Sequence, residues 1–141
     1  MKVRKLADEN VVSSTTLQND DHLAFPIAAN ETWSFSGWLI VTSASGTPDL
    51  RLAFTVPAGA TLRWSGFGDG NTGADHEVIV TSGFVDVFQV TGGSWRDWVQ
   101  VRGIVVNGAN AGTVQMQWAQ NVSNGSAMTI QAGSYLQASR F

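Results

Sequence analysis

Apolar and polar residues alternate along most of this chain with a period of two residues. The clearest case is the segment 50–56, in which every second residue is a large apolar one. Residues 84–91 and 113–120 alternate in the same way. This period is typical of β-strands that bury one face, and no window has the apolar spacing of an amphipathic helix. The pattern therefore predicts an all-β protein.

Turn-forming residues separate the alternating segments. Gly92-Gly93 and Asn107-Gly108 are two such places, and an Asn-Gly pair favours a tight hairpin because both central residues of that turn need a positive φ angle. The result is about nine or ten strands, spaced roughly 8 to 14 residues apart. Short strands at such regular spacing predict an antiparallel β-sandwich with jelly-roll-like connections.

The first 18 residues differ from the rest, because they have a basic tip and only one clear apolar step. We therefore expect an extended N-terminal arm over residues 1–18 and a single β-sandwich domain over residues 19–141. The basic tip either docks on an acidic surface or is simply solvated. The residues expected to anchor the arm are Lys2, Arg4, Lys5, Val11 and Val12.

Charged residues are scarce in this chain. They make up 13% of it, against about 25% in an average soluble domain, and lysine is absent after Lys5. Gly, Ser, Thr, Asn and Gln take their place. Such a surface suits a protein that is part of a larger assembly, since neutral polar groups can be covered without burying charge. Outward glutamines are the candidates for a subunit interface, with a solvated face as the alternative: Gln100, Gln115, Gln117 and Gln120.

Several functional classes are disfavoured by the sequence. It contains no cysteine, which excludes disulfides and thiol catalysis, and we find no convincing catalytic grouping of other residues. Beyond residue 5, five arginines stand against eleven acidic residues, so a nucleic-acid partner is not expected. No apolar run approaches the roughly 20 residues of a membrane helix. We expect neither enzymatic activity nor a cofactor.

Candidate metal ligands are few. The glycine-rich loop 66–75 offers carboxylate oxygens for calcium, but its spacing does not match an EF-hand, and a polar loop without a metal is the simpler interpretation. His22 and His76 are expected to be exposed loop histidines rather than zinc ligands. Asp86 lies within an apolar strand and is expected to point outward between two valines.

Six tryptophans occur, most of them inside strand patterns, where large aromatic residues usually fill cores and interfaces. Trp64 and Trp95 lie nearest to loops. Because aromatic rings stack on sugars, these two are the candidates for an exposed, ligand-facing position.

Several segments resemble a set of small phage virion proteins. The resemblance covers most of residues 13–138 and is weakest over residues 62–104. Similar modules form the all-β parts of head decoration proteins, head fibres, and tail fibres or spikes. The segments that carry the resemblance are STTLQNDDHL at 14–23, AANETW at 28–33, TPDL at 47–50, FTVPAGA at 54–60 and GTVQMQWAQN at 112–121.

The resemblance implies a β-sandwich, often trimeric, on the outer surface of a phage particle. Since the chain is short, the preferred interpretation is a capsid (head) decoration protein, a homotrimer that binds the major capsid protein or another virion protein through its N-terminal arm. The alternative is a receptor- or carbohydrate-binding module of a tail fibre or spike, with Trp64 and Trp95 facing a host-surface glycan. A membrane partner is not expected.

Overall fold

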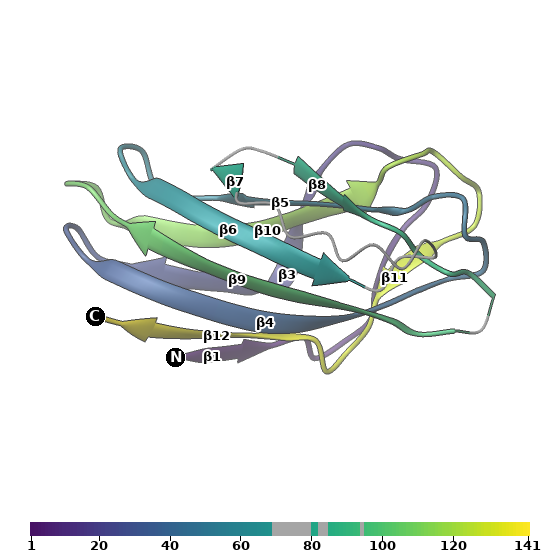
Figure 1. Ribbon diagram of the computed structural model, residues 1–141, viewed down its shortest axis with the longest axis horizontal. Coiled ribbons are helices and arrows are strands. Elements are labelled where there is room, and N and C mark those ends of the chain that lie inside the picture. The colour runs from purple at the N-terminus through teal and green to yellow at the C-terminus, as the bar shows by residue number, and fades with distance from the viewer. Residues whose placement is uncertain (69–79, 82–84, 94) are drawn as a thin grey trace.

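The computed structural model describes residues 1–68, 80–81, 85–93 and 95–141. Within these residues twelve β-strands and no helix occur, and they form two antiparallel sheets (Figure 1). The larger sheet contains β1 (Lys2–Arg4), β2 (Glu9–Val11), β4 (Thr32–Ser43), β6 (Thr61–Gly68), β7 (Val80–Thr81), β9 (Asp97–Val106), β11 (Met128–Ile130) and β12 (Tyr135–Arg140). The smaller sheet contains β3 (Gln18–Ile27), β5 (Leu50–Thr55), β8 (Val85–Phe88) and β10 (Gly112–Gln120). The described residues contain no helix that could span a membrane.

The connections are those of a jelly roll. The strand order is β3-β10-β5-β8 in the smaller sheet and β4-β9-β6-β7 in the larger one, where β12 and β1 continue the sheet beyond β4. From β3 to β10 the chain crosses between the sheets after β3, β4 and β5, stays in the larger sheet from β6 to β7, and crosses again after β7, β8 and β9. This is the eight-stranded arrangement of two Greek keys. The predicted fold class, an antiparallel β-sandwich, is confirmed.

The prediction of a β-hairpin at Asn107-Gly108 is wrong. The strands on either side lie in different sheets, because β9 pairs with β4 and β6, whereas β10 pairs with β3 and β5. The buried side-chain amide of Asn107 donates to the carbonyls of Ala28 at 2.6 Å and Asn110 at 2.9 Å. Asn107 therefore fixes a connection between two sheets rather than a two-residue β-turn.

The N-terminal segment also differs from its prediction. In place of an extended arm over residues 1–18, the structure has β1 paired with β12 and β2 paired with β11, so both strands belong to the larger sheet. The backbone between them is held as well, since the N–H of Lys5 donates to the carbonyl of Ser134 at 2.8 Å. Pairing satisfies backbone groups that a free arm would leave to water.

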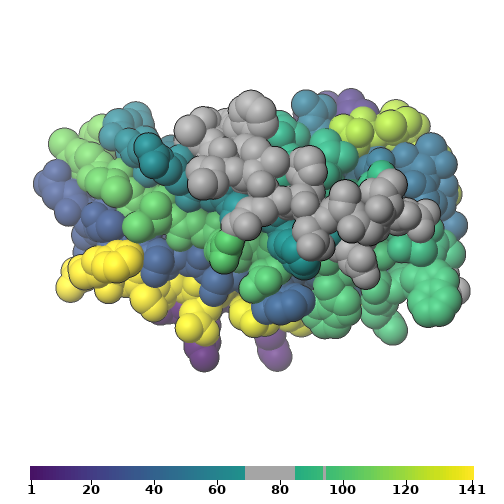
Figure 2. Space-filling view, viewed as in Figure 1, coloured from purple at the N-terminus to yellow at the C-terminus, as the bar shows by residue number. Residues whose placement is uncertain are grey.

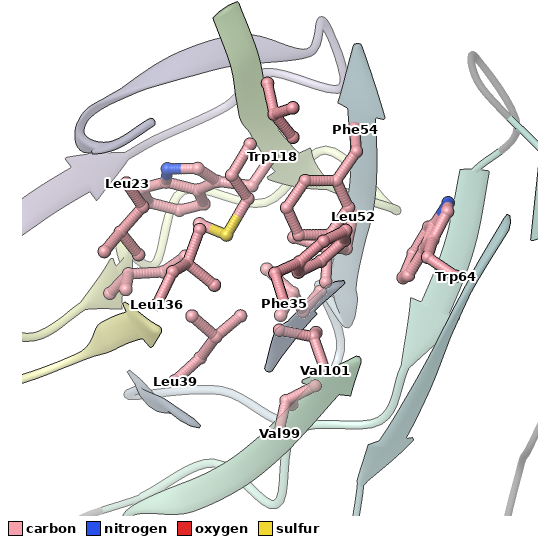
Figure 3. Close-up of a cluster of buried hydrophobic side chains, with 14 of the residues drawn as sticks. Leu23, Phe35, Leu39, Leu52, Phe54, Trp64, Val99, Val101, Trp118 and Leu136 are labelled. Atoms are coloured by element: carbon pink, nitrogen blue, oxygen red, sulfur yellow. The ribbon is translucent and has the colours of Figure 1, made fainter. Parts of the chain in front are cut away.

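The hydrophobic core lies between the two sheets (Figure 3). The alternation at residues 50–56 places Leu50, Leu52 and Phe54 in this core, each with no exposed surface. Phe54 packs between Phe35 of the larger sheet and Trp64, with ring centroids 5.0 and 5.1 Å away. These edge and tilted ring contacts are the geometry that aromatic pairs favour. Other core residues drawn in Figure 3 are Leu23, Leu39, Val99, Val101, Trp118 and Leu136.

Asp86 is buried, so the expectation that it points outward is wrong. It is 6% exposed, whereas its neighbour Val87 is 36% exposed. The reason is the register of β8, which places Asp86 on the same side of the strand as the buried Phe88. The Asp86 carboxylate accepts a hydrogen bond from the N–H of Val87 at 2.9 Å.

Candidate functional site

The outer face of the larger sheet carries a row of side chains in register across five strands. Arg4 of β1 lies opposite Tyr135 of β12, which lies opposite Trp38 of β4; Gln100 of β9 and Phe67 of β6 continue the row. Paired residues of antiparallel strands point to the same side of a sheet, so these five form one rung. Tyr135 and Trp38 are each 37% exposed. Figure 2 shows this face, where atoms of β12, β4 and β9 lie beside one another.

A second tryptophan adjoins this rung. Trp98 of β9 pairs with Ile40 of β4, one rung along the sheet from Trp38, and is 48% exposed. The indole rings of Trp38 and Trp98 have centroids 5.8 Å apart and planes at 78° to each other. Together with Tyr135 they line a shallow hollow of about 430 Å³. We call Trp38, Trp98 and Tyr135 the aromatic patch.

A groove lies beside the aromatic patch on the same face. Its floor is low because serines occupy most of the outward positions of the next two rungs on β12, β4 and β6. The groove has a volume of about 560 Å³. Its outward side chains are Ser34, Ser36, Arg63, Ser65, Arg102, Ile104, Gln137 and Ser139.

A buried ion pair holds the N-terminal segment to the domain. The ammonium of Lys5 donates to Asp20 Oδ2 at 2.7 Å, and both side chains have no exposed surface. Lys5 also donates to Glu9, which is 12% exposed. The other oxygen of Asp20 accepts the N–H groups of His22 at 2.9 Å and Leu23 at 2.8 Å. The ammonium of Lys5 and the carboxylates of Asp20 and Glu9 are engaged with one another and with backbone N–H groups, so this ion pair is a structural element.

The electrostatics of Glu9 agree with that role. Burial alone raises the pKa of this carboxyl group, but the hydrogen bond and charge of Lys5 and the N–H of Asp21 together lower it below its usual value. The amide of Gln18 adds a further hydrogen bond at 2.7 Å. Glu9 is therefore held as a carboxylate.

The arm residues divide into two groups. Lys5 and Val11 are buried, so the expectation that they contact a capsid is wrong: one is needed for the ion pair and the other for the core. Lys2, Arg4 and Val12 are exposed. Their part in binding another protein stays a prediction.

The four candidate interface glutamines lie in three different places. Gln120 is fully buried, and its amide donates to three backbone carbonyls, including that of Ser126 at 2.8 Å, so an interface role for it is wrong. Gln115 and Gln117 lie on the outer face of the smaller sheet and are partly exposed. Gln100 lies on the opposite side of the molecule, in the rung of Trp38. The structure thus does not bring the four together.

The two candidate ligand-facing tryptophans also differ. Trp64 is 1% exposed because the alternation of β6 points its ring into the core, so its assignment as ligand-facing is wrong. Trp95 is 71% exposed, but it does not line the hollow of the aromatic patch. Sequence reasoning missed Trp38 and Trp98. The signal was present, since Trp38 is out of phase with the buried positions of its own strand.

The candidate metal ligands remain dispersed or untested. Residues 69–75 of the proposed calcium loop and His76 lie outside the described residues. His22 is partly buried, at a strand position. Over the described part of the chain, no three His, Asp or Glu side chains come close enough to hold a metal ion.

Comparisons with known proteins give only remote similarity. No protein-family model matches the chain, and no curated protein matches it. The similar solved structures include that of infectious bursal disease virus Gt strain, with 11% identity and a TM-score of 0.26 over 99% of this chain and 36% of that chain. The VP2 subviral particle of the same virus gives 8% identity and a TM-score of 0.26, covering 99% of this chain and 39% of that one. The chain thus spans less than two fifths of the length of either, and TM-scores this low define neither a family nor a function.

Proposed function

We propose that this chain is a structural protein on the outer surface of a phage particle, specifically a head decoration protein that assembles as a homotrimer. The proposal rests on the resemblance of its segments to phage virion modules and on one observation in the structure. That observation is an uncharged area within the outer face of the smaller sheet, which we call the uncharged face. The number of copies, three, comes from the resemblance.

Two adjacent rungs make up this uncharged face. Gln115 is paired on either side with Ala24 and Thr55. Gln117 lies in the neighbouring rung, and its amide donates to Asn19 at 2.8 Å. No residue of either rung is charged, so a second copy can cover this area without removing an ion from water. Arg51, one rung further along, and Asp21, at the irregularity of β3, border the area. Neutral amides at the rim of such a contact can exchange hydrogen bonds between copies.

Light scattering at micromolar concentration tests this assembly. We expect a mass three times the 15.1 kDa of one chain. Gln117→Lys places a charge in the middle of the uncharged face and should reduce the mass to that of one chain. The matched control is Ser36→Lys, which adds the same charge to the outer face of the larger sheet. A monomeric wild-type protein, or dissociation by the control alone, would contradict the proposal.

Attachment to the virion is proposed to use the exposed residues of the N-terminal segment. Lys2 and Arg4 lie on the edge strand β1, with Val12 further along the segment. Deletion of residues 1–12 would also remove Lys5 and two strands, so loss of binding by that variant would be uninformative. Charge reversal of Lys2 and Arg4 leaves the buried ion pair intact and is the better test.

Co-sedimentation with phage heads assembled without this protein measures the attachment. We expect wild-type protein to sediment with the heads and the variant with Lys2→Glu and Arg4→Glu to stay in solution. The variant with Arg51→Glu and Arg96→Glu, which has the same change of net charge away from β1, serves as the control. Binding by the double variant at wild-type strength would show that the segment does not carry the attachment.

A further inference from the structure

We propose that the aromatic patch is a carbohydrate-binding site that takes a pyranose unit of an oligosaccharide. Trp38, Trp98 and Tyr135 come from three neighbouring strands and are all partly exposed. The three rings take no part in the proposed attachment or assembly, so this inference does not depend on the virion assignment, although Arg4 of the same rung is used in both proposals.

The patch is hollowed rather than flat, and this shape fits a small ring. The planes of Trp38 and Trp98 meet at 78°, so the two indoles form a corner, and Tyr135 lines the same hollow. The volume of about 430 Å³ lies within the range of small-molecule sites, roughly 300 to 1,000 Å³. A pyranose has an apolar C–H face that can pack on one indole while its edge meets the other.

Polar side chains lie beside the aromatic rings, where they can form hydrogen bonds with the hydroxyls of a sugar. Gln100 and Arg4 lie in the rung of Trp38 and Tyr135, on either side of the two rings. An amide both donates and accepts hydrogen bonds, and a guanidinium donates several. Ser36 and Gln137 occupy the next rung and line the groove, along which further sugar units of a chain could lie.

The size of the patch argues against a second copy of this protein as its occupant. A fully exposed aromatic side chain offers about 150 to 250 Å², so three rings that are 37–48% exposed offer together about 300 Å² at most. A stable protein interface buries about 800 Å² on each partner. Even with Phe67 of the same rung, which is 45% exposed and adds at most about 110 Å², the apolar surface is only about half of that area, whereas it suffices for one or two sugar rings.

The patch is also rigid, which lowers the entropic cost of binding. Trp38 and Trp98 lie on β4 and β9, which pair over ten consecutive positions from Thr32–Val106 to Val41–Asp97. Side chains held on long paired strands need little rearrangement when a ligand binds. The sheet thus presents the corner in one geometry.

Isothermal titration calorimetry of the whole chain tests the proposal, with cellotetraose, maltotetraose, chitotetraose and tetragalacturonate as probes. We expect at least one probe to bind and Trp98→Ala to weaken that binding about tenfold or more, the scale found for loss of one ring that stacks on a nucleic-acid base. Trp95→Ala removes an exposed indole that does not line the hollow and should leave the affinity unchanged. Because Trp98 is half exposed, its variant should fold, and Gln100→Ala provides a second, milder change that should also weaken binding.

Two outcomes would overturn the inference. One is the absence of binding by all four probes, including the case in which Trp98→Ala instead lowers the mass seen by light scattering, which would assign the patch to contact between copies. The other is an equal loss of affinity in Trp95→Ala and Trp98→Ala. The decoration proposal is judged separately by Gln117→Lys and by sedimentation with heads, so either proposal can fail alone.

Discussion

Replacing Lys5 by methionine tests whether the N-terminal segment is part of the folded domain. Methionine keeps an unbranched, largely apolar chain of similar length, so the substitution removes chiefly the ammonium. In the native structure that ammonium contacts Asp20 at 2.7 Å and also contacts Glu9. Both Lys5 and Asp20 are completely buried, so solvent cannot replace the lost partner of Asp20.

The expected loss of stability follows from this burial. Removal of one partner from a buried ion pair costs about 3–5 kcal/mol, because the other charge is left without compensation. Asp20 retains the N–H groups of His22 and Leu23 on its other oxygen, and Glu9 can regain water, which places the cost toward the lower end. A domain of this length has a total stability of about 7–20 kcal/mol. The loss should lower the melting temperature by about 6–20 °C.

Urea denaturation followed by tryptophan fluorescence measures the effect. The matched control is Lys2→Met, which removes the exposed lysine of the same segment and should change the free energy of unfolding by less than about 0.5 kcal/mol. If residues 1–18 were an arm that detaches without consequence, both variants would unfold at the wild-type urea concentration. Equal midpoints for Lys5→Met and Lys2→Met would therefore refute the integration of this segment into the cooperative unit.

Two further predictions concern the packing of the core and the loss of stability at acidic pH. Trp64→Ala should lower the free energy of unfolding by about 3–5 kcal/mol, because the ring of Trp64 is buried against Phe54. Trp95→Ala should lower it by less than about 0.5 kcal/mol. Similar urea midpoints for the two variants would contradict the burial of Trp64. Hydrogen bonds from Arg140, from the Trp33 indole and from a backbone N–H lower the pKa of Glu31 from 4.5 to about 2. The ionised carboxylate of Glu31 therefore contributes stability that is complete above pH 4.5 and is lost as the pH falls toward 2. Glu31→Gln should therefore lose less stability than wild type between pH 5 and pH 2.5 in urea titrations, and an unchanged pH dependence would exclude this contribution.

The period-two pattern was enough to predict the fold class, because sheets that bury one face impose it on every strand. The segment 50–56 became β5, and residues 113–120 fall within β10. Pairing partners did not follow from the same pattern. Asn107-Gly108 has the composition of a hairpin turn, yet it joins two sheets, because the choice of sheet is decided by packing between distant strands.

The predicted site residues failed where a polar or charged residue is satisfied inside the fold. Lys5 and Gln120 are residue types that usually face water, and nothing local in the sequence shows that Asp20 or the carbonyl of Ser126 will meet them. Proximity to a loop also misled the assignment of Trp64. Phase along the strand is the better guide, since it separates the buried Trp64 from the exposed Trp38.

Several carboxylates of this domain are used for bonds within the fold. Asp20 and Glu9 neutralise Lys5, and Asp97 accepts both the N–H and the hydroxyl of Thr91. Asp49 accepts the N–H of Val90, and its partial burial raises its pKa. A hydrogen bond from a neutral group leaves the charge of a carboxylate in place, so among these acids only Asp20 and Glu9 have part of their charge cancelled, by Lys5. The contacts of the uncharged face should be set by shape and neutral hydrogen bonding, whereas charge should matter on the larger sheet, where Lys2, Arg4, Arg63 and Arg102 are exposed.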